Sequence, residues 1–260
     1  MKALLSLLLI GLVSFTHAKT LVISDIDDTI KDSEVLHKIK AVSKAFQTDR
    51  PFKGMSELYN LMDDEFRAQN EEALFFYVSN APEDILGVTH NLFILRNGFP
   101  NGEVVLREKL SEQNHKIKTI EALLQLHRPD RVILIGDNGE RDPEIYNTAV
   151  NTLFVRYGVK ESLQYIRMAY PKYDDGKPTF KDQLVFTAAG EIGADLYLKG
   201  LLSLWRAQSS LNHSQTSKGA LRLPGWVDCS EHSSFLLDPS IDFKGLEANS
   251  LLDSIDERCN

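Results

Sequence analysis

The chain has 260 residues, 43% of them hydrophobic and 25% charged, which suits one large globular domain or a domain with an extension. Its 37 acidic residues outnumber its 29 lysines and arginines, so the formal net charge is -8. Because the sequence has no basic block, we exclude nucleic acid as an expected partner.

The first 18 residues are typical of a secretory signal peptide. Lys2 precedes an almost wholly apolar run over residues 3–13, and the small residue Ala18 offers a cleavage point. This run is too short to cross a bilayer comfortably. We therefore expect a secreted or periplasmic protein that begins at Lys19 after cleavage. An uncleaved anchor and a buried N-terminal helix are the alternatives.

Short apolar runs rich in β-branched and aromatic residues predict buried strands. The strong candidates are residues 20–24, 73–78 and 131–136, and the weaker ones are residues 103–106 and 152–157. These runs are nearly continuous rather than alternating, which is typical of parallel strands that are covered on both faces.

Helical patterns separate these strands. Pro82 followed by two acidic residues predicts one helix start, Ser111 predicts a second, and Asp142 before Pro143 predicts a third. A polar, mostly helical insert over residues 31–70 follows the first strand. Strands that alternate with helices predict an α/β fold with right-handed crossovers.

The pattern changes after about residue 160. Residues 183–205 predict a helix, and residues 207–219 resemble a polar, serine-rich linker. We therefore expect a core over residues 19–160 and a mostly helical extension over residues 161–260.

Cys229 and Cys259 are the only two cysteines of the sequence. In an exported chain such a pair is a candidate disulfide. Two free thiols are the alternative.

Polar residues follow each of the three strong strands. Asp25 and Asp27 follow the first, Ser79 and Asn80 the second, and Asp137 the third. Ligands of open α/β sheets bind beyond the carboxyl ends of the strands, so these side chains are expected to converge on one crevice.

Clustered carboxylates repel one another and favour a divalent cation at this crevice. A calcium loop is excluded, because it needs glycine and glutamate where the sequence has Ile30 and Leu36. Mg²⁺ commonly bridges carboxylates and a substrate phosphate. The phosphate would use Ser79 and the N–H groups near Ala81, and a lysine would complete the charge balance. This combination predicts phosphoryl transfer.

Four motifs occur in the order of the haloacid dehalogenase (HAD) phosphatase superfamily, which the sequence resembles. They are DIDDT (25–29), YVSN (77–80), Lys116 within HKIKTI, and GDNGERD (136–142). This resemblance implies a HAD-like Rossmannoid sheet, with the insert over residues 31–70 as a small cap that leaves the site open.

Longer segments of the sequence are similar to the catalytic domain of actin-patch-type phosphatidate phosphatases. These segments are SDIDDTIK, YVSNAPEDIL, GFPNGEVVLRE and IGDNGERDPEIY. The chain departs from that group at Ala81 and Asn138, where serine is common. The resemblance covers about residues 20–157 and little of the rest.

The resemblance implies catalytic roles for Asp25, Asp27 and Lys116. Asp25 would be the nucleophile that forms an aspartyl-phosphate. Asp27 would be the general acid and then the general base. Lys116 would bind the phosphoryl oxygens, with Lys118 as its rival for this role. Asp28 is expected to be a local hydrogen-bonding residue.

The resemblance also implies binding roles. The Mg²⁺ ligands would be the Asp25 carboxylate, the main-chain carbonyl of Asp27 and Asp137, with Asp142 beside the metal or paired with the lysine. Ser79 and Asn80 would bind substrate, and Thr29 would support the loop.

The expected function is that of an exported Mg²⁺-dependent phosphomonoesterase that hydrolyses phosphatidate to diacylglycerol and phosphate. A phosphatase of soluble sugar, nucleotide or protein phosphoesters is the alternative. A phosphate-binding protein without activity is the third reading, but it would predict loss of Asp25 or Lys116.

Trp205 and Trp226 are candidates for peripheral membrane contact, with core packing as the alternative.

Overall fold

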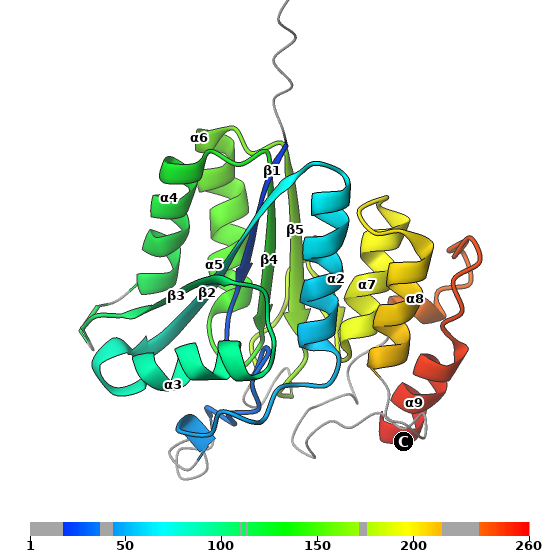
Figure 1. Ribbon diagram of the computed structural model, residues 1–260, viewed down its shortest axis with the longest axis horizontal. Helices are drawn as coiled ribbons and strands as arrows, with labels where there is room; N and C mark the ends of the chain where they lie inside the picture. The colour runs from blue at the N-terminus through cyan, green and yellow to red at the C-terminus, as the bar shows by residue number, and fades with distance from the viewer. Residues whose placement is uncertain are drawn as a thin grey trace, which may run out of the picture.

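The structure is a computed structural model (Figure 1). It describes residues 18–36, 44–109, 111–112, 114–171, 176–214 and 234–259. The predicted signal peptide up to His17, Cys229, Trp226 and the side chain of Cys259 lie outside the described residues. Export and the disulfide therefore stay predictions.

The described part of the chain forms one parallel sheet with the strand order β3-β2-β1-β4-β5-β6. The strands are β1 (Lys19–Ser24), β2 (Glu72–Pro82), β3 (Gly102–Arg107), β4 (Arg131–Asp137), β5 (Glu161–Arg167) and β6 (Leu184–Phe186). Central strand β1 pairs with both β2 and β4, so that Val22 lies between Phe75 and Ile133. The strand order reverses between β1 and β4, which is where open α/β sheets bind ligands.

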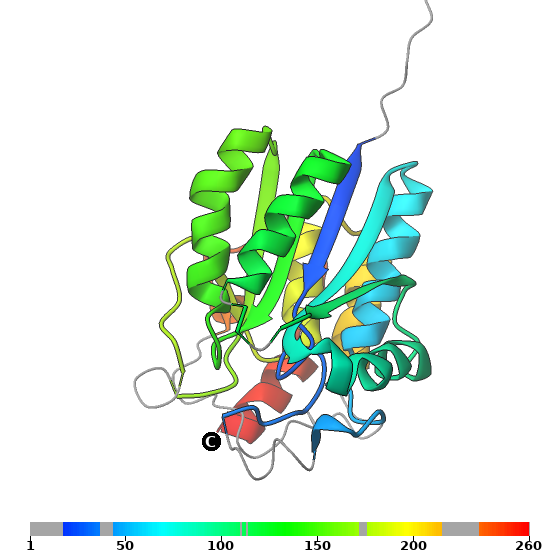
Figure 2. The ribbon, with the colours of Figure 1, turned by 90° about the vertical axis from the view of Figure 1, so that its left-hand side faces the viewer.

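Helices cover both faces of the sheet (Figures 1 and 2). One face carries α2 (Met55–Ala68) and α7 (Ala189–Leu198), and the other carries α4 (His115–His127) and α5 (Asp142–Thr148). Helix α3 (Glu83–Arg96) connects β2 to β3. This arrangement confirms the predicted α/β class with a parallel sheet flanked by helices.

Alternate residues of β1 show why the apolar runs are continuous. Val22 packs into one core with Leu58 of α2, whereas Leu21 and Ile23 pack into the other core with Leu124 of α4. Both faces of the strand are thus buried. This is why continuous apolar runs correctly predicted β1, β2 and β4.

The prediction of a strand over residues 152–157 is wrong. The chain there is helical, with a π-helix (Ala149–Phe154) followed by α6 (Val155–Tyr157). Gly158 then ends the helix with a positive φ of 72°. Short apolar runs of buried helices and strands look alike, and this one packs Phe154 into a core. The strand beside β4 is β5 instead.

Much of the predicted cap insert over residues 31–70 belongs to the core. Helix α2 places Leu58, Tyr59 and Met62 against the sheet, at the spacing of one helical face. Residues 31–36 and 44–54 of the insert remain outside this helix.

The sheet continues beyond residue 160, because β5 and β6 extend it. The predicted helix over 183–205 is divided into β6, α7 and the start of α8 (Leu204–His213), which also occupies part of the predicted linker. Gly200, with a φ of 75°, follows the end of α7.

A third apolar cluster joins the C-terminal helices. Ala194 of α7, Leu211 of α8 and Leu251 of α9 (Asn249–Cys259) contribute to it, and a 3-10 helix (Phe235–Leu237) packs beside them. Trp205 is 60% exposed and lies against Arg206, so it is not a core residue. Among the described residues, no helix combines the length and apolar character needed to span a bilayer.

Candidate active site

The carboxyl ends of β1 and β4 bring together three carboxylates and one lysine, all buried. Lys116 Nζ lies 2.6 Å from Asp25 Oδ1 and 2.5 Å from Asp142 Oδ1. The Thr29 hydroxyl lies 3.0 Å from Asp25 Oδ2 and 3.2 Å from Asp137 Oδ2. The predicted residues from three separate motifs therefore converge on one cluster.

Backbone geometry fixes these side chains. The N–H of Asp25 donates to the Ile135 carbonyl at 2.8 Å, which continues the pairing of β1 with β4 beyond the strand. Asp142 begins α5 and turns back over Gly136. A Cβ at position 136 would lie 2.4 Å from Asp142 Oδ2, so only glycine permits this approach.

The acidic cluster can bind a metal ion. Asp25, Asp137 and Asp142 each offer a carboxylate oxygen within 4.8 Å of the other two. Asp142 Oδ2 is buried and has no hydrogen-bond partner among the described residues. Hard carboxylate oxygens suit Mg²⁺ and similar cations. The Asp27 carboxylate points away from this acidic cluster. Asp27 could therefore contribute only its main-chain carbonyl to the metal site, as the resemblance implies.

The electrostatics of the cluster favour an added positive charge. Burial raises the pKa of Asp25, Asp137 and Asp142 above the usual range. Repulsion from Asp142 adds to this effect at Asp25 and Asp137, and repulsion from Glu140 adds to it at Asp142. Burial alone would lower the pKa of Lys116, but Asp142 and Asp25 raise it well above its usual value. One lysine faces three carboxylates, so a divalent cation would stabilise their ionised forms.

Asp27 forms a second group beside the cluster. Ser33 donates to its Oδ1 at 2.7 Å, Ser79 donates to its Oδ2 at 3.0 Å, and His90 Nε2 lies 3.0 Å from the same Oδ2. Burial by itself would raise the pKa of Asp27. The hydrogen bond and charge of His90, with help from Lys31, instead hold it well below its usual range.

Sequence reasoning missed His90, which is fully buried in α3. Its other ring nitrogen faces the carbonyl of Leu86, one turn earlier. The sequence did contain one signal for this position. His90 follows Leu86 by four residues, so both side chains lie on the same face of α3. Nothing in the local sequence linked that face to Asp27, 63 positions away.

Asp28 holds the loop that follows the first motif. It has a φ of 60°, and its carboxylate accepts hydrogen bonds from the N–H groups of Ser33, Glu34 and Val35 and from the Tyr170 hydroxyl. Burial raises the pKa of Asp28 to about 6. The prediction of a local hydrogen-bonding residue is confirmed.

Arg167 is a second residue that the sequence did not indicate. Its buried guanidinium lies between the rings of Phe52 and Phe186, 4.1 and 4.7 Å from their centroids. It donates to the main-chain carbonyls of Thr29 and Thr187. Burial lowers its pKa to about 10. Arg167 therefore supports the loop that carries Thr29.

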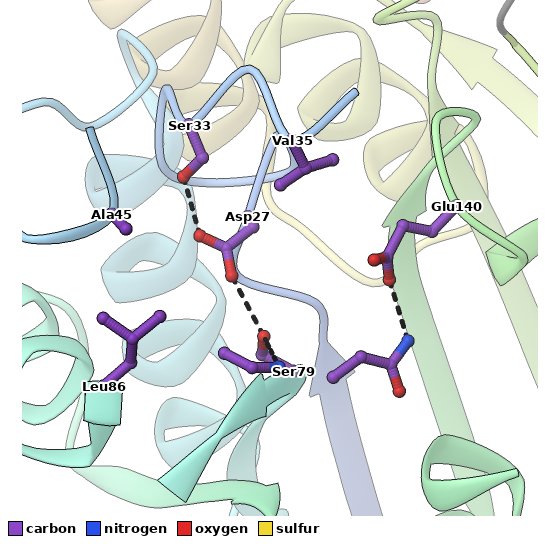
Figure 3. Close-up of a pocket in the computed structure, with 9 residues that line it drawn as sticks. Asp27, Ser33, Val35, Ala45, Ser79, Leu86 and Glu140 are labelled. Atoms are coloured by element: carbon purple, nitrogen blue, oxygen red, sulfur yellow. Dashed lines mark hydrogen bonds between the residues drawn. The ribbon is translucent and has the colours of Figure 1, made fainter. Parts of the chain in front are cut away.

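A pocket of about 280 Å³, here called the Asp27 pocket, opens beside this group (Figure 3). Its wall is apolar at Val35, Ala45, Ala81 and Leu86, and polar at Asp27, Ser33, Ser79, Asn80 and Glu140. Figure 3 shows the Asp27 carboxylate between Ser33 and Ser79, with Glu140 on the opposite side. Asn80 donates to Glu140 at 2.8 Å across the rim.

The two lysines that the sequence left open lie in different surroundings. Lys116 is buried against Asp25, whereas the Lys118 side chain is 62% exposed and contacts Glu112 at 3.4 Å. Only Lys116 is therefore placed to contact a ligand at Asp25.

Residues 20–155, which are more than half of the chain, match the family described as "Phosphatidate phosphatase APP1, catalytic domain". The chain belongs to this family. The match includes every residue of the acidic cluster, Ser79 and Lys116. Membership agrees, at the level of the catalytic domain, with the expectation of a phosphoric monoester hydrolase.

A curated relative is the Phosphatidate phosphatase APP1 of Saccharomyces cerevisiae. It is 32% identical over 139 residues, which cover 48% of this chain and 22% of the yeast protein. The chain thus spans less than a quarter of the length of this relative.

Proposed function

We propose that this chain is a Mg²⁺-dependent phosphomonoesterase of the HAD type that hydrolyses phosphatidate to diacylglycerol and phosphate. The observation that carries the proposal is the arrangement of Asp25 between Lys116 and Thr29, next to Asp137 and Asp142. This arrangement lies wholly within the family match.

Asp25 is the proposed nucleophile. Lys116 and Thr29 each bind one of its carboxylate oxygens, which orients the carboxylate at the switch point of the sheet. Attack on phosphorus by a carboxylate oxygen would give an aspartyl-phosphate. Lys116 would then neutralise charge on the phosphoryl oxygens, which is where phosphoryl transfer gains most of its catalysis.

Ser79 and Asn80 are the proposed substrate ligands at the end of β2. The Ser79 hydroxyl lies between Asp27 and the N–H of Ala81, so it is held close to the proton-transfer group. A Mg²⁺ ion held by Asp25, Asp137 and the Asp27 carbonyl would supply positive charge to the phosphoryl group. Asp142 would keep Lys116 in place.

Asp27 and His90 together are the proposed proton-transfer pair. His90 has an oxygen partner on both sides of its ring, the Leu86 carbonyl at Nδ1 and the Asp27 carboxylate at Nε2. A proton that moves from His90 Nε2 to Asp27 Oδ2 makes Asp27 an acid for the leaving alcohol. Asp27 as the carboxylate then serves as base for the hydrolytic water.

Two features support a lipid substrate. The apolar side of the Asp27 pocket ends at Leu86 in α3, and the exposed surface of the same helix carries Ile85, Val88 and Leu95. These side chains are 53%, 77% and 72% exposed. An exposed apolar surface on a helix that also lines the pocket suits peripheral contact with a lipid interface, with the acyl chains left outside the protein.

The first 18 residues support a secreted or periplasmic location, and the same setting would permit a disulfide between Cys229 and Cys259.

Soluble phosphoesters remain the alternative substrates. A pocket of about 280 Å³ is at the small end of ligand sites, and it suits a headgroup or a single sugar. The net charge of -8 also opposes approach to an anionic membrane.

The deciding experiment measures phosphate release from phosphatidate in mixed micelles, p-nitrophenyl phosphate, nucleotides and sugar phosphates. We expect the highest kcat/KM for phosphatidate. If a nucleotide or sugar phosphate is preferred by about tenfold, roughly 1.4 kcal/mol of transition-state binding, the lipid proposal fails.

A further inference from the structure

A second pocket lies beside the candidate active site, and we call it the Arg107 pocket. It has a volume of about 310 Å³ and is lined by Arg107, Asn114, His115, Lys116 and Arg141, among others. The pair Asn80 and Glu140 lines this pocket and also the Asp27 pocket. The hydrogen bond between these two side chains therefore lies where the two pockets meet.

Arg107, at the end of β3, is the cation of this pocket that no described acidic residue pairs with. Its Nε is buried and has no hydrogen-bond partner among the described residues, and no described acidic residue pairs with its guanidinium. The other two cations are engaged, since Lys116 contacts Asp25 and Arg141 contacts Glu144 at 3.0 Å. A buried, unsatisfied guanidinium donor costs free energy unless a ligand accepts its hydrogen bonds.

The N-terminus of α4 adds an independent attraction for anions. This helix of 13 residues has no side-chain cap at Asn114 and no acidic residue in its first turn. Its first residues, His115 and Lys116, line the pocket. Free N–H groups and the positive end of the helix dipole favour an oxyanion at this position.

The two acidic residues of the pocket are engaged with other side chains. Glu112 contacts Lys118 at 3.4 Å, and Glu140 accepts from Asn80 at 2.8 Å. Burial lowers the pKa of His115, which disfavours a charged ring. The guanidinium of Arg107 and the helix N-terminus therefore determine which ligand the pocket attracts.

We propose that the Arg107 pocket binds a phosphate-type oxyanion that is distinct from the ester under attack. This inference rests on the proposed phosphatase function. The ligand has two sources: the orthophosphate product on its way past Lys116, or a second phosphate group carried by the substrate. A second phosphate of the substrate would occupy the pocket while the leaving group fills the Asp27 pocket, whereas the orthophosphate product would occupy it after hydrolysis of the aspartyl-phosphate.

The first test measures orthophosphate binding by isothermal titration calorimetry in an Asp25→Asn background, with and without Mg²⁺. Adding Arg107→Ala should weaken binding about tenfold, the typical loss of a hydrogen bond to a charged group, and Arg107→Lys should restore part of it. Glu140→Gln should have the opposite sign and tighten binding, because it removes a negative charge from the rim. Arg156→Ala, an exposed arginine that pairs with Glu121, is the control.

The second test separates the two sources through inhibition of p-nitrophenyl phosphate hydrolysis. A raised Ki for orthophosphate in Arg107→Ala identifies the product as the ligand. A Ki that rises more for glucose 1,6-bisphosphate than for glucose 6-phosphate identifies a second phosphate of the substrate.

Two results would overturn the proposal. In one, Arg107→Ala and Arg107→Gln leave every Ki and the orthophosphate Kd unchanged in folded protein. In the other, Arg107→Ala lowers kcat/KM for p-nitrophenyl phosphate by the same factor that it raises the orthophosphate Ki, so that Arg107 belongs to the reacting phosphoryl site. Binding to Asp25→Asn needs no turnover, so its outcome is independent of whether the chain is a phosphatase.

Discussion

His90 Nε2 lies 3.0 Å from Oδ2 of Asp27, and Nδ1 of the same ring lies 3.2 Å from the Leu86 carbonyl oxygen. The ring is fully buried, so no water competes for these contacts. The pair fixes the direction of the Asp27 carboxylate and keeps a proton beside it. In this account His90 is a positioning residue that acts through Asp27.

Replacement of His90 by alanine should lower kcat by about ten- to a hundredfold, with a smaller change in KM, because proton transfer by Asp27 becomes inefficient. The pKa of Asp27 should rise without its partner, so the acid limb of the kcat profile should move to higher pH. The measurement is a pH–rate profile of His90→Ala and His90→Gln, with the exposed His213→Ala as control. An equal loss of kcat at all pH values would mean that His90 has only a structural role.

A divalent cation should raise thermal stability as well as activity. Mg²⁺ added to EDTA-treated protein should increase Tm, because a ligand that binds only the folded state stabilises it by mass action. Asp137→Asn should reduce this increase and the activity together, whereas Asp64→Asn, an exposed acid on α2, should retain both. A Tm that is unchanged by Mg²⁺ in wild-type protein would argue against the acidic cluster as a metal site.

Asp28 should make stability depend on pH between about 4 and 6. Its pKa is raised to about 6 in the folded chain from an ordinary value of 3.8, so the folded state binds the extra proton in this range. The stability from protonated Asp28 is complete below pH 4 and is lost as pH rises through 6.

Urea denaturation of wild type and Asp28→Asn in EDTA measures this effect. The free energy of unfolding of wild type relative to the variant should fall by roughly 2 kcal/mol between pH 4 and pH 7. A constant difference across this range would show that Asp28 does not titrate there.

The exposed apolar surface of α3 should matter for lipid and not for soluble substrates. Replacing Val88 and Leu95 by glutamate should lower kcat/KM for phosphatidate in mixed micelles about tenfold, since apolar burial at the interface is lost. Turnover of p-nitrophenyl phosphate should be unaffected. Leu126→Glu, at a 75% exposed position of α4, is the matched control. Equal effects of the α3 and α4 variants would remove this support for an interfacial substrate.

The sequence was sufficient for the parts of the fold and site that depend on local pattern. Strands β1, β2 and β4 are continuous apolar runs because both faces are buried, and Asp25, Ser79 and Asp137 follow from their ends. Strand β5 was not predicted, because Gln164 and Arg167 interrupt its apolar pattern.

The parts of the fold and site that the sequence did not predict depend on contacts between segments that are distant in the sequence. His90 meets Asp27 only because α3 folds back under the first loop, and Arg167 meets Thr29 across 138 positions of sequence. No local periodicity encodes such pairs. The division of the insert between α2 and the loops above the site likewise depends on how Leu58 and Met62 pack against the sheet.

The central claim is that Asp25 becomes phosphorylated during turnover. The most direct measurement is a rapid acid quench of wild-type protein turning over phosphatidate labelled with ³²P, followed by peptide mapping. We expect hydroxylamine-sensitive label on the tryptic peptide of residues 20–31, and neither label nor turnover in a folded Asp25→Asn variant. Full turnover by Asp25→Asn, or wild-type turnover without label on that peptide, would contradict it.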